Sequence, residues 1–137
     1  MHIWEHDNSI SYYNLLNIDY EWIQSPVGER LRETYRNIHI FISSSTQEGC
    51  HNPPREAMAA ECALVATNVG CIPDIAEDNV NAFVVNPGSS EEIVDKVSQL
   101  IECPDLINKL ASTGKERILL DTWDSKVNQF ESYLENL

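Results

Sequence analysis

Three short apolar runs, separated by segments with helical spacing, predict the framework of this chain. The runs cover residues 38–42, 64–67 and 83–85. Each is of strand length and shows no alternation of polar residues, which is typical of a strand covered on both faces. Strands joined by helices cross over in the right-handed sense. The pattern therefore predicts a parallel sheet with helices on both faces, the Rossmann-like doubly wound α/β class.

The segments around these runs carry the signals of helices. Residues 20–24 suit a short strand, and residues 26–37 a helix that Pro26 opens. Pro53 and Pro54 are typical of the start of another helix. Gly70 and Pro73 indicate a turn, which is followed by a short helix or a second turn.

The last third of the chain is expected to be helical. Ser89 with Glu92 forms a capping box before a helix with a stripe of Ile93, Val97, Leu100 and Ile101, up to a break at Pro104. A further helix is expected over 106–118, where Gly114 is expected to disturb the helix. The final helix has its apolar residues at a 4,3,4,3 spacing, Trp123, Val127, Phe130, Leu134 and Leu137, and this stripe is either packed or a docking surface.

Length and composition narrow the classes of protein. The 137 residues suffice for one domain, expected over 20–137, whereas 1–19 has no sustained period and is an uncertain N-terminal segment. The formal net charge of −13 argues against a nucleic-acid partner. No apolar run approaches the roughly 20 residues of a membrane span. We therefore expect no transmembrane segment and a cytoplasmic location. The four cysteines form no CxxC pair, which indicates reduced, partly buried thiols rather than zinc or redox sites.

The polar loop after the first run, residues 43–52, is the expected place for chemistry. Doubly wound sheets bind ligands at the carboxyl ends of their strands. The loop leads into a helix whose unpaired amides favour phosphate without a lysine. Gly49 lets the backbone approach a ligand closely, and Glu48 and Glu56 are acceptors suited to the hydroxyl groups of sugar and ribose.

A family resemblance rests on the same residues. Glu48 and Glu56 have seven residues between them, in the setting Ser-x-x-x-Glu-Gly followed by Pro-x-Glu-Ala-Met-Ala. This resembles the glutamate-x7-glutamate motif of retaining GT-B transferases, glycosyltransferase family four of the group 1 type. The stretches 64–70, 72–73, 84–88 and 122–124 resemble the family's next elements in order, so the resemblance covers about residues 26–134.

The resemblance implies a function and a site. The chain is expected to be the C-terminal, donor-binding half of a GT-B enzyme that takes a hexosyl-type sugar from a nucleotide-diphosphate sugar to a glycan or lipid-linked acceptor. Glu48 is the implied catalytic residue beside the donor sugar, and Glu56 binds the ribose hydroxyls. The backbone that lines the sugar and diphosphate is Gly49, Cys50, His51 and Asn52. The family uses no bound metal there, and this chain has no Asp-x-Asp motif; no cofactor is expected.

Three departures from the family keep alternatives open. Glu61 and Cys71 stand where the family has glycine, and the family's upstream basic residues for the diphosphate are not recognisable. The chain also looks too short for a whole enzyme, so a missing N-terminal acceptor-binding domain or a partner chain is expected. A degenerate, non-catalytic nucleotide-binding or interaction subunit is the main alternative. A flavodoxin-like regulatory domain is a weaker one, because no acidic cluster ends an early strand.

Single residues of the loop also allow simpler interpretations. Glu56 alone suits a carboxylate that complements a helix dipole, and Glu48 a solvated loop residue. A histidine such as His51 in a polar loop is usually just solvated. Arg55 suits a phosphate contact, an ion pair with Glu61, or a position in solvent.

Overall fold

The chain forms two compact units, Met1–Thr34 and Tyr35–Leu137, in the computed structural model, which describes residues 2–3 and 19–136. In the first unit, β1 (His2–Ile3) pairs in parallel with β2 (Glu21–Trp22). The helix α2 (Gly28–Arg36) begins in this unit and ends in the second. The short strand expected within 20–24 and the helix expected within 26–37 are therefore confirmed. The expected boundary after residue 19 falls inside the first unit.

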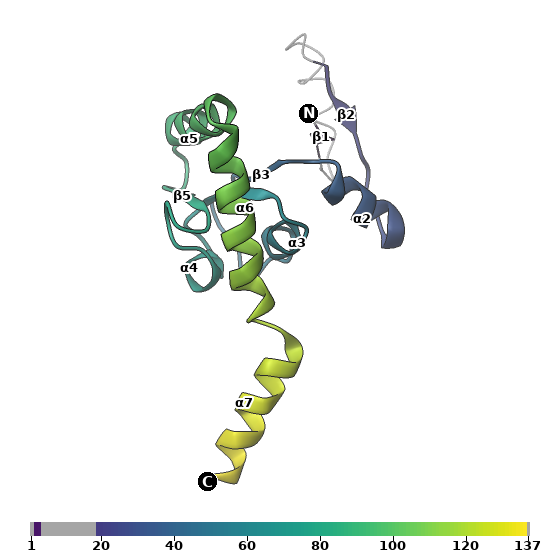
Figure 1. Ribbon diagram of the computed structural model, residues 1–137, viewed down its shortest axis with the longest axis vertical. Helices are drawn as coiled ribbons and strands as arrows, with labels where there is room; N and C mark the ends of the chain where they lie inside the picture. The colour runs from purple at the N-terminus through teal and green to yellow at the C-terminus, as the bar shows by residue number, and fades with distance from the viewer. Residues whose placement is uncertain (1, 4–18, 137) are drawn as a thin grey trace. The chain divides into compact units, whose positions relative to one another are not determined.

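The second unit contains the predicted parallel sheet. Its strands are β3 (Ile40–Ser43), β4 (Ala63–Thr67) and β5 (Phe83–Val85), in the order β3-β4-β5 (Figure 1). Both pairs are parallel, with Ile40 opposite Ala63 and Val65 opposite Phe83. The sheet prediction is confirmed, although β3 begins two residues later than the apolar run.

Five helices complete the second unit over its described residues. They are α3 (Pro53–Ala59), α4 (Ile72–Ile75), α5 (Ser90–Glu102), α6 (Pro104–Leu119) and α7 (Trp123–Glu135). Figure 1 shows α6 crossing the region of the three strands, with α3 and α4 on either side of its lower half. The alternation of strand and helix is the one that the apolar runs predict.

Two hydrophobic clusters cover the two faces of β4. One face packs Leu64 and Ala66 against side chains of α3, α4 and the end of α6, namely Met58, Ile72, Ile75 and Ile118. The other face packs Ala63 and Val65 against Phe83, Leu100 and Leu110, from β5, α5 and α6. Because helices lie on both faces, the sheet is doubly wound, as expected.

The capping box before α5 forms only in part. The Ser89 side chain accepts from the Glu92 amide at 3.4 Å, which caps the helix. The Glu92 carboxylate does not return to Ser89 but accepts from the backbone and side-chain nitrogens of Asn86, both at 2.8 Å. These bonds lower the pKa of Glu92. The expected stripe on α5 is also narrower than predicted, since Ile101 is exposed.

Pro104 and Gly114 have roles that differ from those expected. Pro104 ends one helix but also opens α6 directly. Gly114 does not disturb α6, which runs unbroken through it. A Cβ at Gly114 would lie 3.0 Å from the carbonyl oxygen of Asn81 and 3.5 Å from Cε of Met58. The glycine therefore allows close packing of α6.

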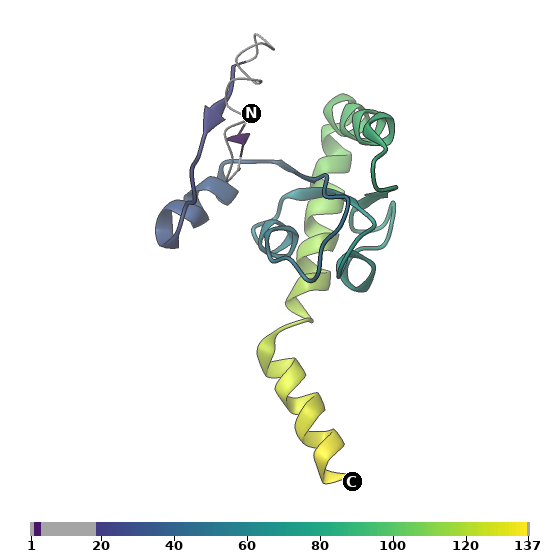
Figure 2. The same cartoon turned by 180° about the vertical axis from the view of Figure 1, so that it is seen from behind.

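The apolar stripe of α7 is exposed rather than packed. None of the helix's described residues is buried, and Trp123 is 87% exposed. The other exposed members are Val127, Phe130 and Leu134, while Leu137 lies outside the described residues. Figure 2 shows α7 as a separate helix after the turn that ends α6. No helix in the described part of the chain has the length and hydrophobicity to cross a membrane.

Candidate functional site

Two loops meet at the carboxyl edge of the sheet. One joins β3 to α3 and the other joins β4 to α4, and these two strands are neighbours, with Ser43 opposite Ala66. The backbones touch, because a Cβ placed on Gly70 would lie only 1.9 Å from the carbonyl oxygen of Gly49. It would also lie 3.2 Å from Cβ of Glu48. The site expected from the sequence is therefore a junction of two loops rather than a single loop.

Glu48 is held by a chain of hydrogen bonds that begins on β4. The hydroxyl of Thr67, the last residue of β4, donates to the carbonyl oxygen of Ser45 at 2.6 Å. The Ser45 hydroxyl in turn donates to Oε1 of Glu48 at 2.7 Å. Glu48 is exposed, so its carboxylate can meet a ligand while the backbone beside it is anchored to the sheet.

Glu56 lies in the first turn of α3, as expected, and is half-buried. Its Oε2 accepts a hydrogen bond from the hydroxyl of Tyr35 at 2.9 Å. Among the residues that the structure describes, Oε1 has no hydrogen-bond partner. A carboxylate with one oxygen bound and the other open is suited to accept from a ligand hydroxyl.

The loop before α3 offers backbone donors. None of the amides of Gly49, Cys50, His51 and Asn52 donates to another described residue. The helix itself supplies fewer amides than a usual helix start, because Pro53 and Pro54 have no N–H. The amide of Glu56 is also taken, by the carbonyl of Asn52 at 3.0 Å. The open donors for an anion are thus mainly the loop amides, and in the first turn of α3 only the amide of Arg55 joins them.

His51 is tied into the site rather than simply solvated. Its Nε2 lies 3.1 Å from the hydroxyl oxygen of Ser43 at the end of β3. Its Nδ1 is buried and has no partner among the described residues. A buried polar atom without a partner costs free energy unless a ligand or water satisfies it. This atom is a further open group beside the loop amides.

Arg55 pairs with Asp121, and not with Glu61 or solvent. Its Nη1 lies 2.5 Å from Oδ2 of Asp121, whereas Glu61 binds Lys115 at 2.8 Å. Burial alone would lower the pKa of Arg55, but the hydrogen bond and charge of Asp121, together with contacts to the Cys71 and Cys50 thiols, raise that pKa, so the guanidinium stays charged. To contact a phosphate, the Arg55 guanidinium would therefore have to break its ion pair with Asp121 or bind both groups at once.

The cysteines are free thiols, as expected, but two are not buried. Cys50 and Cys103 are exposed, while Cys62 and Cys71 are buried. Burial raises the pKa of the Cys62 thiol to about 11, which makes it unreactive. Burial, and then contact with the Cys50 thiol, also raises the pKa of Cys71. The described residues bring together no group of three His, Cys, Asp or Glu side chains that could hold a metal.

Three residues of this region were not found from the sequence. Tyr35 contacts Glu56, Thr67 anchors the Glu48 loop, and Asp121 binds Arg55. Tyr35 lies in the segment 26–37 that the sequence predicts to be helical, and a buried tyrosine carries a hydroxyl that needs a partner. Asp121 lies 66 positions from Arg55, and no local pattern indicates a pair at that separation.

Known proteins are similar to most of this chain. A family model described as "Glycosyl transferases group 1" matches residues 12–117. The capsular polysaccharide biosynthesis glycosyltransferase CapM of Staphylococcus aureus is 29% identical over 84 residues, which are 61% of this chain and 22% of CapM. The chain therefore spans only a small part of the length of this curated relative.

Solved structures support the same assignment. The C-terminal domain of LpcC, a glycosyl transferase group 1 family protein of Francisella tularensis, matches with a TM-score of 0.70 and 29% identity, over 81% of this chain and 62% of that chain. HepE of Anabaena, solved in complex with UDP-glucose, matches with a TM-score of 0.75 over 93% of this chain and 35% of its own. At 21% identity, HepE shows the fold alone.

The match to the family covers more than half of the chain, and the fold agrees with it. The parallel α/β unit is that of the C-terminal domain of GT-B glycosyltransferases. This chain belongs to the group 1 glycosyl transferase family.

Proposed function

We propose that this chain is the donor-binding half of a retaining glycosyltransferase and holds a nucleotide-diphosphate sugar in the loops after β3 and β4. One observation carries the proposal. Glu48 and Glu56 are each held by a hydroxyl group, on either side of a run of loop amides that are open to a ligand. The UDP-glucose complex of HepE, which has the same fold, supports this class of donor.

Each group at the site has a proposed role. Glu56 accepts from the ribose hydroxyls, and the amides of Gly49, Cys50, His51 and Asn52 donate to the diphosphate and sugar. Glu48 lies beside the sugar as the proposed catalytic carboxylate, where it stabilises positive charge that develops at the anomeric carbon. In a chain of net charge −13, backbone dipoles are an effective way to hold an anion locally. No metal or cofactor is part of the proposal.

The acceptor half of the reaction is proposed to come from residues outside this chain, as an N-terminal domain or a partner. Support comes from the relatives, since the matched region is 22% of CapM and 35% of HepE. A hexosyl-type sugar and a glycan or lipid-linked acceptor are the proposed substrates. The role of CapM in capsular polysaccharide biosynthesis supports a glycan acceptor.

The role of Glu56 is tested by calorimetry with UDP, GDP and ADP. Replacing Glu56 by Ala should weaken binding of the preferred nucleotide by about 1–3 kcal/mol, the usual loss for a charged hydrogen-bond partner. Glu91→Ala is the matched control, because Glu91 is also a first-turn carboxylate, on α5. It should leave the affinity unchanged.

The outcome separates ligand binding from a role in the helix. If both folded variants bind the nucleotide as the wild-type chain does, Glu56 only complements the helix dipole and the proposal is wrong. A chelator added to the same titration tests the metal-free mode. A large loss of affinity on chelation would show that a metal holds the diphosphate.

A non-catalytic nucleotide-binding subunit is the second candidate, and one observation favours it. Arg55, the cation beside the loop, is engaged by Asp121 and lies against the Cys71 and Cys50 thiols. The diphosphate would then be held by backbone amides without a free cationic side chain, so it would be bound less tightly than in a site that has both. In this case the chain would still bind the nucleotide, but it would transfer no sugar, even in a complex with a partner.

A further inference from the structure

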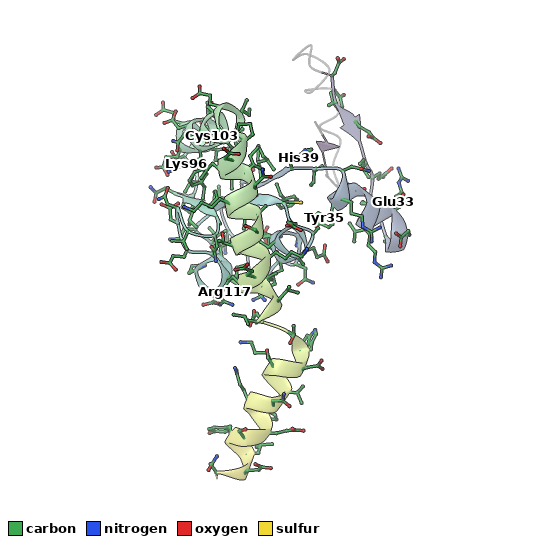
Figure 3. All side chains as sticks on the ribbon, viewed as in Figure 1. Glu33, Tyr35, His39, Lys96, Cys103 and Arg117 are labelled. Atoms are coloured by element: carbon green, nitrogen blue, oxygen red, sulfur yellow. The ribbon has the colours of Figure 1, made fainter. Side chains whose placement is uncertain are left out.

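Tyr35 lies outside the glutamate-x7-glutamate motif, but the fold places its hydroxyl in contact with Glu56. Tyr35 lies in the last turn of α2, where the second unit begins (Figure 3). It is 3% exposed. Its hydroxyl oxygen is 2.9 Å from Oε2 of Glu56 and 3.3 Å from the carbonyl oxygen of Pro53. The hydroxyl has one hydrogen to donate, and the charged carboxylate at the shorter distance is the better acceptor.

The ring and backbone of Tyr35 are both fixed. The carbonyl oxygen accepts from the Cys62 thiol at 3.5 Å and from the Ile38 amide at 3.3 Å. The ring packs against that of Phe41, with centroids 5.9 Å apart and planes tilted by 51°. The hydroxyl oxygen on so constrained a ring stays at a fixed point, since it can move away from Glu56 only if the core repacks.

The hydroxyl also keeps its proton. Burial, followed by the hydrogen bond to Glu56 and the charge of that carboxylate, raises the pKa of Tyr35 well above its usual range. Tyr35 therefore keeps the hydrogen that it donates to Glu56. A deprotonated phenol at this place would repel the carboxylate.

The contact fixes one half of the Glu56 carboxylate and leaves the other half open. With Oε2 bound, the carboxylate cannot rotate freely, and Oε1 has no partner among the described residues. A carboxylate fixed in advance loses less conformational entropy when it binds a ligand. We propose that Tyr35 is the positioning residue for Glu56, and that its hydrogen bond presents Oε1 to the ribose hydroxyls of the donor. This inference rests on the proposed ribose role of Glu56.

The test compares two nucleotides that differ only at the ribose. Calorimetry measures the affinities of UDP and 2′,3′-dideoxy-UDP, or of the GDP or ADP pair if that nucleotide binds more tightly. In Tyr35→Phe the affinity for UDP should fall about three- to tenfold, the value of one net hydrogen bond. The affinity for the dideoxy nucleotide should stay as in the wild-type chain. Tyr133→Phe, at an exposed tyrosine on α7, is the matched control and should change neither affinity.

A double-mutant cycle with Glu56→Ala completes the test. Tyr35→Phe should have no further effect on UDP affinity once Glu56 is removed, because the two residues act through one bond. If Tyr35→Phe does not fold, Tyr35→Leu also lacks the hydroxyl and keeps an apolar side chain, and the same selective loss is expected.

The outcomes distinguish this inference from the proposed function. If the wild-type chain binds neither nucleotide, or binds both equally, the ribose role of Glu56 fails and this inference fails with it. If the wild-type chain prefers UDP but Tyr35→Phe leaves the preference unchanged, Tyr35 is only structural. An equal loss for both nucleotides, or effects that add in the cycle, would overturn the inference in the same way.

Discussion

Gly70 shows how a single residue shapes the junction of the two site loops. Its backbone has a φ of +57°, in the left-handed region that favours glycine. A Cβ there would also lie 1.9 Å from the carbonyl oxygen of Gly49, a distance that no relaxation of side chains can remove. Gly70 is therefore required both for its own conformation and for the position of the loop opposite.

Gly70→Ala should destabilise the protein by more than its backbone conformation alone explains. The left-handed conformation costs a non-glycine residue about 1–2 kcal/mol, and the clash with Gly49 adds about 1–3 kcal/mol. Gly88→Ala is the matched control, because Gly88 has a φ of +82° and open space around its Cβ position. Urea unfolding of both variants measures the difference. An equal loss of unfolding free energy in the two would show that the loops separate without cost.

At the residue scale the sequence was informative where a position needs an unusual backbone conformation. Glu61 stands where the family has glycine, and its φ of +67° lies in the left-handed region that favours glycine. Arg55 was not predictable in the same way, because a long cation has many acceptors within reach and its partner comes from the far end of the fold. The roles of Glu48 and Glu56 as ligand contacts stay predictions.

At the scale of elements, Asp121 joins three helices. It follows α6, and its carboxylate binds Arg55 of α3 at 2.5 Å and Lys126 of α7 at 2.7 Å. The bond from Lys126, followed by that from Arg55, lowers the pKa of Asp121 to about 2. We expect the Arg55 bond to contribute more to stability, since Lys126 is 55% exposed and its pair is screened by solvent.

The link predicts a dependence of stability on pH. An unfolded aspartate has a pKa of about 3.9. Because folding lowers this pKa, the ionised Asp121 contributes its full stabilisation above about pH 4 and loses it as the pH falls towards 2. Asp121→Asn should cost about 1–3 kcal/mol at pH 7, and the gap to the wild-type chain should shrink between about pH 4 and 2.

Denaturant unfolding at several pH values measures this gap. Asp95→Asn, at an exposed position on α5, is the control and should give a small difference at every pH. A gap for Asp121→Asn that is constant down to pH 2, or that grows in acid, would contradict the assignment of this ion pair.

The positions of helices and strands were predictable where the spacing of apolar residues agreed with the places of proline and glycine. They were less predictable where contacts between distant parts of the chain determine the structure. The runs at 64–67 and 83–85 and the helix start at Pro53 follow from local patterns. The continuity of α6 through Gly114 does not, because it depends on the close approach of Asn81 and Met58. The exposure of the α7 stripe could not be predicted either, because the spacing of apolar residues predicts an apolar face but not which part of the structure covers it.

At the scale of the whole molecule, the proposed function makes one α/β unit one side of a glycosyl transfer site. Transfer needs an acceptor hydroxyl held near the anomeric carbon and water kept out, and such positioning can contribute about 7–11 kcal/mol to the rate. In the proposed site, the loops after β3 and β4 would contact the donor from a single side. We therefore expect the 137-residue chain to bind a donor but not to transfer its sugar.

Mass spectrometry of products tests this expectation. The purified chain is incubated with UDP-glucose and other nucleotide sugars, together with candidate glycan and lipid-linked acceptors. Slow hydrolysis of the donor is the most that should appear. Robust transfer that Glu48→Ala or Glu56→Ala abolishes would show that the acceptor site is already contained in this chain.

The complete burial of β4 has a consequence for how such a protein can evolve. Residues 63–66 are 0% exposed and Thr67 is 1% exposed. No position of the strand therefore faces solvent, where a substitution would leave the packing of the core unchanged. Every change there alters one of two packed clusters or the anchor of the Glu48 loop. If the proposed function is right, we expect sequence changes that alter donor preference to fall in the loops after β3 and β4, while the buried strand beneath them keeps its residues.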